Sequence, residues 1–300
     1  MNYLKKKPII KEDIEQFEIK DKTSKIVSNF YKSKPFPNYK INDDKVSVVE
    51  RGNKNLLAKQ FKSFVGYNKK VLEVGCGTGQ LSIYFSTGNN NLVVSLDATT
   101  ESLIIAKNFA KKNNIENIRF VQSDIFDDVL TENYFDFVWC NGVLHHTKNP
   151  SEGFKIITKS LKKDGYILVG LYNKYGRIRT LIRKFFFKIF GKKILNFFDP
   201  TLKKLKLSVE EQESWIQDQY QNPQESLHTL DEVIGWFKNN NVEFISSIPC
   251  CDFEDEYDDI FEKKSVGNLV SRILNQIFMI FGRLGSDGGL FVVIGKKKNV

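Results

Sequence analysis

A short apolar segment that runs into three glycines spaced two apart constrains the fold more than any other feature of this chain. Residues 71–80 read Val-Leu-Glu-Val-Gly-Cys-Gly-Thr-Gly-Gln, and an amphipathic segment follows. Glycine has no Cβ, so the chain can turn sharply here and a ligand can approach the bare backbone. The amides at the start of the following helix then face whatever lies above the strand. The pattern predicts a strand–turn–helix unit with a ligand site at the carboxyl end of the strand.

Acidic residues lie at the end of this strand and of the next two predicted strands. They are Glu73, Asp97 and Asp124. Asp97 comes 22 residues after Gly75, and a carboxylate at such a position can accept hydrogen bonds from both hydroxyls of a ribose. Taken singly, Asp97 and Asp124 fit helix N-caps equally well. Three acids and three glycines at the carboxyl ends of strands favour a single ligand site.

The remaining strands alternate with helices, which predicts an α/β fold with helices on both faces of a mostly parallel sheet. A capping box formed by Thr229 and Glu232 starts a helix that continues to Lys238. The sheet is expected to be Rossmann-like and seven-stranded. Its strands are predicted over 71–74, 92–97, 118–124, 135–140, 166–172, 242–248 and 290–295.

The order of the acids, the Asp136-x-Val138 strand and the Leu161-Lys162-x-x-Gly165 turn resemble the class I S-adenosylmethionine-dependent methyltransferases. The catalytic domain is similar to that of ubiquinone and menaquinone biosynthesis methyltransferases. The resemblance implies S-adenosyl-L-methionine as the cofactor, a last strand antiparallel to the others, and contact of the third acid with the adenine amino group. The cofactor-binding residues that it implies are Glu73, Gly75, Cys76, Gly77, Gly79, Gln80, Asp97, Ala98, Asp124, Ile125 and Asn141.

Methyl transfer from a sulfonium is an in-line displacement, so the protein mainly positions the acceptor and can remove its proton. The candidate bases are the three histidines, His145, His146 and His228, because imidazole has a pKa near ~6.5. Each histidine also fits a role in orienting a loop or packing the core. Tyr220 and His228 resemble part of a module that contributes to the acceptor side in other bacterial methyltransferases.

The segment after the fourth strand differs from that of the resembled quinone O-methyltransferases. Those enzymes carry two acids and a histidine there, where they hold a metal. Here residues 141–146 contain no acid and only His146 matches, so we predict no metal site. The same segment contains no Asn-Pro-Pro-Tyr-type sequence, which argues against methylation of an exocyclic amine of a base or of glutamine.

Three segments lie outside the predicted core. Residues 1–60 are expected to form a lid or a clasp, and residues 61–300 the methyltransferase domain. Two insertions, at 174–228 and 252–286, interrupt that domain. Because the flanking strands complete one sheet, we interpret each segment as an attachment rather than a separate domain.

The first insertion is strongly basic. Residues 174–206 hold eleven Lys and Arg against one acid, in a chain of net charge +9. An apolar helical stripe with basic flanks and back describes an interfacial helix, a lid helix or, with a poorer fit, a nucleic-acid surface. We expect a second amphipathic stripe, over 266–284, to pack on the first and form a helical cap over the substrate side. The first stripe comprises Ile178, Leu181, Ile182, Phe185 and Ile189, and its basic neighbours are Arg179, Arg183, Lys184 and Lys188.

These observations predict a methyltransferase that acts on an oxygen or nitrogen nucleophile of a small, lipophilic molecule. The alternatives are a tRNA methyltransferase that uses the basic segments, and a non-catalytic module that binds the cofactor or a membrane surface. The four cysteines have the spacing of neither a disulfide framework nor a metal site, and no apolar run approaches the ~20 residues of a membrane span. We therefore expect a cytoplasmic location, with contact to an anionic membrane left open.

Overall fold

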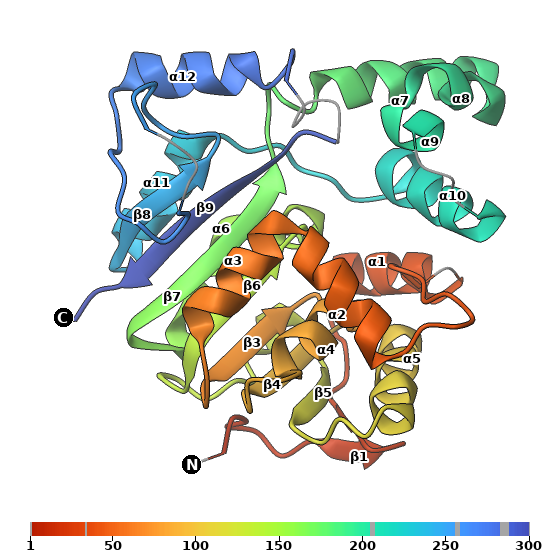
Figure 1. The fold of residues 1–300 in the computed structure, drawn as a ribbon, viewed down its shortest axis with the longest axis vertical. Helices are drawn as coiled ribbons and strands as arrows, with labels where there is room; N and C mark the ends of the chain where they lie inside the picture. Colours follow the sequence, from red (N-terminus) through yellow and green to blue (C-terminus); the bar gives the residue numbers. More distant parts are fainter. Residues whose placement is uncertain (1, 34, 205–207, 256–258, 283–287, 300) are drawn as a thin grey trace.

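The computed structural model describes residues 2–33, 35–204, 208–255, 259–282 and 288–299. A mixed nine-stranded sheet runs through the molecule, with strand order β1-β2-β5-β4-β3-β6-β7-β9-β8 and helices on both sides (Figure 1). The strands are β1 (Ile9–Lys11), β2 (Ile14–Gln16), β3 (Lys70–Val74), β4 (Leu92–Asp97), β5 (Ile118–Gln122), β6 (Phe135–Asn141), β7 (Leu161–Tyr172), β8 (Val242–Ile248) and β9 (Leu290–Lys297). Among these residues, no helix has both the length and the apolar character needed to cross a bilayer.

The seven predicted strands are all present and in the expected directions. Strands β3 to β7 pair in parallel, and β9 lies antiparallel between β7 and β8. The predicted strand count was nevertheless wrong, because an N-terminal hairpin adds β1 and β2 at the edge beside β5. Glu12 and Asp13 form its turn with positive φ angles, and Ile14 is its buried anchor. Two strands of three residues each are too short to give an alternation of apolar and polar residues that the sequence could reveal.

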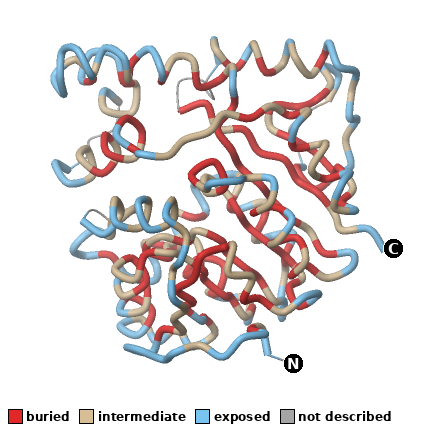
Figure 2. The backbone as a smooth tube through the Cα atoms, turned by 180° about the vertical axis from the view of Figure 1, so that it is seen from behind, coloured by how far each residue is buried: buried red, intermediate tan, exposed pale blue. Residues whose placement is uncertain are grey.

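Helices cover both faces of the central strands. Leu72 and Val74 of β3 belong to one buried cluster, whereas Val71 belongs to the cluster on the opposite face. Strands buried on both faces read as continuous apolar runs, which is why they were predictable. Figure 2 shows the resulting buried centre. The covering helices are α2 (Lys45–Lys54), α3 (Leu56–Val65), α4 (Gln80–Ser86), α5 (Thr100–Lys112), α6 (Pro150–Ser160) and α11 (Leu230–Asn239).

The predicted capping box is confirmed at the start of α11. The Thr229 side chain accepts a hydrogen bond from the Glu232 amide, and the Glu232 carboxylate accepts one from the Thr229 amide. Two otherwise unpaired amides of the first turn are thereby satisfied. This helix packs against β8 and β9, which closes the sheet on the side of the two insertions.

The two insertions lie at one end of the molecule (Figure 1). The first contains α7 (Ile178–Phe190), α8 (Leu195–Phe198), α9 (Pro200–Lys204), α10 (Val209–Ile216) and a π-helical turn, Gln217–Gln221; the second contains α12 (Leu269–Phe278). The expectation that their apolar stripes pack on each other was wrong, because the described residues of both stripes are largely exposed; positions 283 and 284 of the second stripe lie outside the described residues. The buried sides of α7 and α12 instead carry polar residues, such as Arg183 and Gln276.

Candidate active site

A cavity of about 460 Å³ lies at the carboxyl ends of the parallel strands. Its volume falls within the range of about 300–1,000 Å³ that is usual for small-molecule sites. Ten of the eleven residues implied by the resemblance line it, and Gly79 is the exception. The ten are Glu73, Gly75, Cys76, Gly77, Gln80, Asp97, Ala98, Asp124, Ile125 and Asn141.

The glycine turn needs the left-handed backbone that glycine permits. Gly75, Gly77 and Gly79 have φ angles of 67°, 52° and 74°. A Cβ on Gly77 would lie 2.2 Å from the carbonyl oxygen of Phe36, and one on Gly79 would lie 2.8 Å from the Ala106 Cβ. Gly79 therefore serves the contact between α4 and α5 rather than the cavity wall.

Two of the acids have both a structural role and a face toward the cavity. Asp97 accepts hydrogen bonds from the amides of Gly77 at 2.8 Å and Thr99 at 2.7 Å. Asp124 accepts one from the Phe126 amide at 3.0 Å through Oδ1. Asp124 thus caps the 3-10 turn Ile125–Asp127, whereas Asp97 supports the glycine turn, because the N-cap residue of α5 is Thr99; both acids also line the cavity.

Two oxygen atoms in the cavity wall are buried without a hydrogen-bond partner among the described residues. They are Oδ2 of Asp124 and Oδ1 of Asn141. The Asn141 oxygen lies against Gly170, where an added Cβ would come within 1.7 Å of it, so the unpaired Asp124 oxygen is the one that indicates a donor supplied by a ligand. The residues present therefore fit S-adenosylmethionine, whose adenine amino group, ribose hydroxyls and ammonium are all donors. In that arrangement Asp124 would hold the adenine amino group and Asp97 the ribose.

The remaining acid, Glu73, is almost fully buried beneath the glycine turn. Its carboxylate accepts a hydrogen bond from the Ser82 hydroxyl, which in turn contacts the Ser95 hydroxyl at 2.6 Å. Burial raises the pKa of Glu73 to about 8, with the nearby Asp97 carboxylate acting in the same direction. A bound cation would relieve this penalty, so the cavity favours a positively charged ligand at this end.

The N-terminal segment covers the cavity and is fastened to the glycine turn. Helix α1 (Lys22–Ser33) contributes Val27, Ser28 and Tyr31 to the cavity lining, and Phe36 and Pro37 follow. The Thr78 amide donates to the Phe36 carbonyl at 3.3 Å, and the Gln80 side chain donates to the Asn38 carbonyl at 2.9 Å. The segment thus combines the features of a lid and of a clasp.

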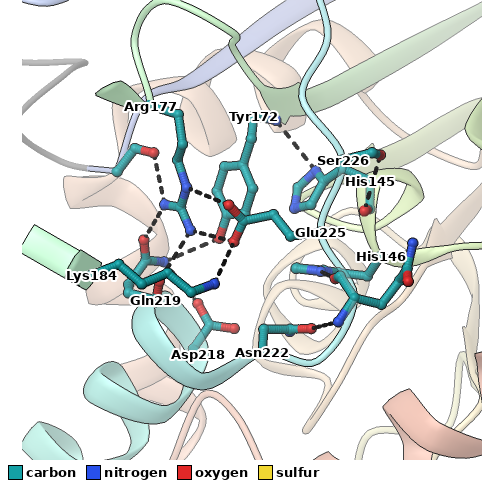
Figure 3. A network of polar contacts seen from close by, with 12 residues as sticks. His145, His146, Tyr172, Arg177, Lys184, Asp218, Gln219, Asn222, Glu225 and Ser226 are labelled. Carbon is teal, nitrogen blue, oxygen red and sulfur yellow. Dashed lines mark hydrogen bonds and ion pairs between the residues drawn. The ribbon is translucent and has the colours of Figure 1, made fainter. Parts of the chain in front are cut away.

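A polar network closes the opposite, acceptor side of the cavity (Figure 3). The Tyr31 hydroxyl donates to Asp218 at 2.6 Å, and the Asn222 amide donates to the Tyr31 oxygen at 2.9 Å. Behind them, the buried Arg177 forms an ion pair with Glu225 at 2.9 Å and donates to Gln219 Oε1 at 2.6 Å. The lid and the first insertion are therefore joined across the cavity.

Of the three histidines, His146 lines the cavity. Its Nδ1 lies 2.6 Å from the carbonyl oxygen of Gln224. A carbonyl can only accept, so Nδ1 carries the hydrogen and Nε2 keeps its lone pair. Burial lowers the pKa of His146, although the Asp218 charge opposes this shift. The imidazole is therefore neutral near pH 7.

The other two histidines lie outside the cavity lining. His145 is completely buried, and its Nδ1 accepts a hydrogen bond from the Tyr172 amide at 3.3 Å. Burial holds the pKa of His145 well below its ordinary value. His228 contacts the Ser226 hydroxyl at 2.8 Å through Nε2 and packs against Trp236. His145 and His228 therefore support the fold and do not face the cavity.

The π-helical turn Gln217–Gln221 brings to the cavity two residues that sequence reasoning missed. Asp218 and Gln219 line the cavity, whereas Tyr220, which the sequence singled out, donates to Asp199 at 2.5 Å on the other side. The extra residue in a π turn rotates the following side chains relative to an α-helix, and such turns are frequent at functional sites. No local sequence signal marks such a turn.

Comparison with known proteins places this architecture in a family. A family model described as "Methyltransferase domain" matches residues 66–227. The ubiquinone biosynthesis O-methyltransferase of Glaesserella parasuis is 30% identical over 122 residues, which is 39% of this chain and 50% of that protein. The uncharacterized methyltransferase YcgJ of Bacillus subtilis is 30% identical over 104 residues, 34% of this chain and 41% of that protein. The aligned part spans half or less of these relatives.

Solved structures show the same fold. PKMT2 from Rickettsia typhi superposes with a TM-score of 0.59 at 14% identity, over 88% of this chain and 55% of that one. A second structure of PKMT2, in complex with AdoHcy, gives a TM-score of 0.57 at 15% identity, over 78% of this chain and 49% of that one. The matched family model covers more than half of the chain, from the end of α3 through all five parallel strands β3–β7. The chain therefore belongs to the class I S-adenosylmethionine-dependent methyltransferases.

Proposed function

We propose that this protein transfers a methyl group from S-adenosylmethionine to an oxygen or nitrogen nucleophile of a small, lipophilic molecule. The observation that carries the proposal is the position of His146, which lines the same cavity as the cofactor residues and presents a free Nε2 lone pair. The cofactor supplies an already activated methyl group when bound. The chain has to align the acceptor and accept its proton.

His146 is suited to take that proton. The Gln224 carbonyl fixes the tautomer, and burial keeps the ring neutral at neutral pH. The neighbouring Asp218 charge stabilises the imidazolium that forms once the proton is transferred, since it raises the pKa of the ring. The pairing of His146 with Asp218 resembles catalytic triads, in which an acid stabilises the protonated form of a histidine base.

The rest of the acceptor side supports a lipophilic molecule with one polar group. Val143, Trp215 and Leu290 contribute apolar surface to the cavity. The polar side chains there are concentrated around Asp218 and His146. An acceptor with an apolar body and a single hydroxyl or amine fits this division. The names of several relatives record O-methyl transfer in ubiquinone biosynthesis, which supports an oxygen nucleophile.

A lipophilic acceptor also resides in membranes, so the proposal includes peripheral contact with an anionic membrane. Within residues 1–60, helix α1 and the residues Phe36 to Asn38 act as the lid over the cavity of the domain formed by 61–300. For the acceptor to enter, the Tyr31–Asp218 contact has to open, because it spans the acceptor side.

Two measurements test the proposal. Mass spectrometry of small molecules that co-purify with the protein identifies an acceptor, and transfer of a labelled methyl group to it is then followed. We expect His146→Ala to lower turnover by about 10²–10⁴-fold while the affinity for S-adenosylhomocysteine, measured by calorimetry, is unchanged. His228→Gln is the matched control, because His228 is outside the cavity lining. Wild-type turnover in His146→Ala would show that His146 is not the base.

A further inference from the structure

Helix α12 is amphipathic, but it is turned the other way from a helix that covers a core with its apolar side. Its polar side faces the protein, where Arg272 pairs with Asp231 at 2.7 Å and Gln276 accepts a hydrogen bond from the Leu230 amide at 2.9 Å. Its apolar side faces away, and Val270 and Phe278 are 64% and 54% exposed. Polar anchors hold the helix in place, so its apolar face is left for a partner.

Helix α7 has the same inverted arrangement. Its inner side carries Thr180 and Arg183, both buried, and Arg183 lies 3.9 Å from the buried Asp199 carboxylate. Its outer side carries a stripe of apolar residues in which Phe185 and Phe190 are 60% and 61% exposed. Arg183, which the sequence placed on the basic flanks and back of the stripe, is therefore an internal charge.

These outer faces lie at the same end of the molecule. In Figure 1, α7, α8 and α12 occupy the end opposite to β1, and in Figure 2 their outer edges are exposed. Phe197 and Phe198 of α8 are exposed as well and extend the face of α7. We call the outer faces of these three helices the apolar platform. Exposed apolar surface on this scale marks an interaction site.

Basic residues border the apolar platform. Lys188, Lys192 and Lys193 are exposed at the carboxyl end of α7 and just after it. Lys192 lies 3.3 Å from Glu213, in an exposed pair that costs little to open. Exposed Phe flanked by Lys is the composition of helices that lie in the plane of a membrane interface.

We infer that the apolar platform docks on an anionic lipid bilayer. The inference deepens the proposed function, on which it rests for a lipophilic acceptor, by naming the surface that meets the membrane. A second copy of the chain is a poorer occupant, because a two-fold interface built from the platform would enclose the lysines of both copies, and α7, α8 and α12 carry no acid to pair with them. An anionic surface instead complements these charges and accepts the Phe side chains into the headgroup region.

Vesicle flotation with the full-length protein tests the inference. We expect flotation with phosphatidylcholine vesicles that contain phosphatidylglycerol, and much less with phosphatidylcholine alone. Each lysine near an anionic surface contributes about five-fold to binding, so Lys188→Gln/Lys192→Gln/Lys193→Gln should lower it by on the order of 100-fold. Phe185→Ser/Phe278→Ser should abolish flotation on both vesicle types.

Matched variants separate these effects from general changes in charge or hydrophobicity. Lys54→Gln/Lys59→Gln/Lys69→Gln removes the same charge from exposed positions outside the platform and should float like the wild type. Ile41→Ser/Leu56→Ser removes exposed apolar side chains outside the platform and should also float normally. Calorimetry with S-adenosylhomocysteine verifies that each variant is folded. If the wild type itself did not bind S-adenosylhomocysteine, the proposed function rather than this inference would be overturned.

Three outcomes overturn the inference. Equal, negligible flotation on both vesicle types would leave the platform without a lipid partner. A dimer in analytical ultracentrifugation that Phe185→Ser/Phe278→Ser dissociates, without vesicle binding, would assign the platform to a second copy. If the protein bound tRNA but not vesicles, and the platform lysine variant lost the tRNA binding, the platform would be assigned to nucleic acid.

Discussion

Replacing Glu73 with Gln should make the unfolding free energy of the cofactor-free protein less dependent on pH. Burial raises the pKa of Glu73 to about 8, from 4.5 for an ordinary glutamate. A group whose pKa is higher in the folded state favours folding below its unfolded pKa, and the contribution is lost as the pH rises through the folded pKa. The wild type should therefore lose stability between about pH 4.5 and 8 from this group, whereas the isosteric amide does not titrate.

The two pKa values set the size of this effect. At about 1.4 kcal/mol per pKa unit, the difference corresponds to an upper limit of about 5 kcal/mol. Glu73 lines a cavity that water can enter, so we expect a change of about 2–3 kcal/mol. Gln at position 73 keeps an oxygen that can accept from Ser82, so its other contacts are preserved at every pH.

Urea unfolding at pH 5 and pH 9, followed by tryptophan fluorescence, measures the change. The quantity to compare is the difference in unfolding free energy between variant and wild type at each pH. Asp97, whose pKa burial also raises, is present in both proteins, so its own burial cancels and its repulsion of Glu73 is part of the measured difference. Parallel pH profiles for the two proteins would refute the reasoning, because they would show that Glu73 titrates normally in the folded state.

Three further substitutions test the site and its supports. Asp97→Ala should weaken S-adenosylhomocysteine binding by about 1.5–3 kcal/mol in calorimetry, and unchanged affinity would remove Asp97 from the site. Gly77→Val should also lower that affinity, because the new Cβ displaces the Phe36 carbonyl and opens the lid; proteolysis of the lid should then be faster than in the wild type. Arg177→Met should destabilise the fold by about 3–5 kcal/mol in urea unfolding, whereas adding Glu225→Gln should recover part of the loss.

The sequence predicted the cofactor side of the molecule well because its signals are local. A glycine turn with positive φ, an acid at a strand end and the capping box at Thr229 each depend on residues a few positions apart. The buried parallel strands add continuous apolar runs. These signals located the seven strands, and the resemblance to the methyltransferase family added the direction of the last strand and ten residues of the cavity wall.

The acceptor side was less predictable because it depends on contacts between distant segments. The lid residue Tyr31 meets Asp218 across 187 positions of sequence, and a π turn decides that Asp218 rather than Tyr220 faces the cavity. Amphipathic periodicity located α7 and α12 but could not tell which side faces inward. The side of each helix that faces inward is fixed by ion pairs with residues outside the helix, such as Arg272–Asp231 and Arg183–Asp199.

The lid contacts both halves of the cavity, and this has a consequence for the order of events in each catalytic cycle. On one side Phe36 and Asn38 accept hydrogen bonds from the glycine turn, and on the other Tyr31 bonds to Asp218. If this segment opens for both ligands, as we propose, each ligand that favours its closed form raises the affinity for the other by the same factor. Demethylated cofactor and methylated product would then hinder each other's departure, and the reopening of this segment, rather than the transfer itself, would set the pace of turnover.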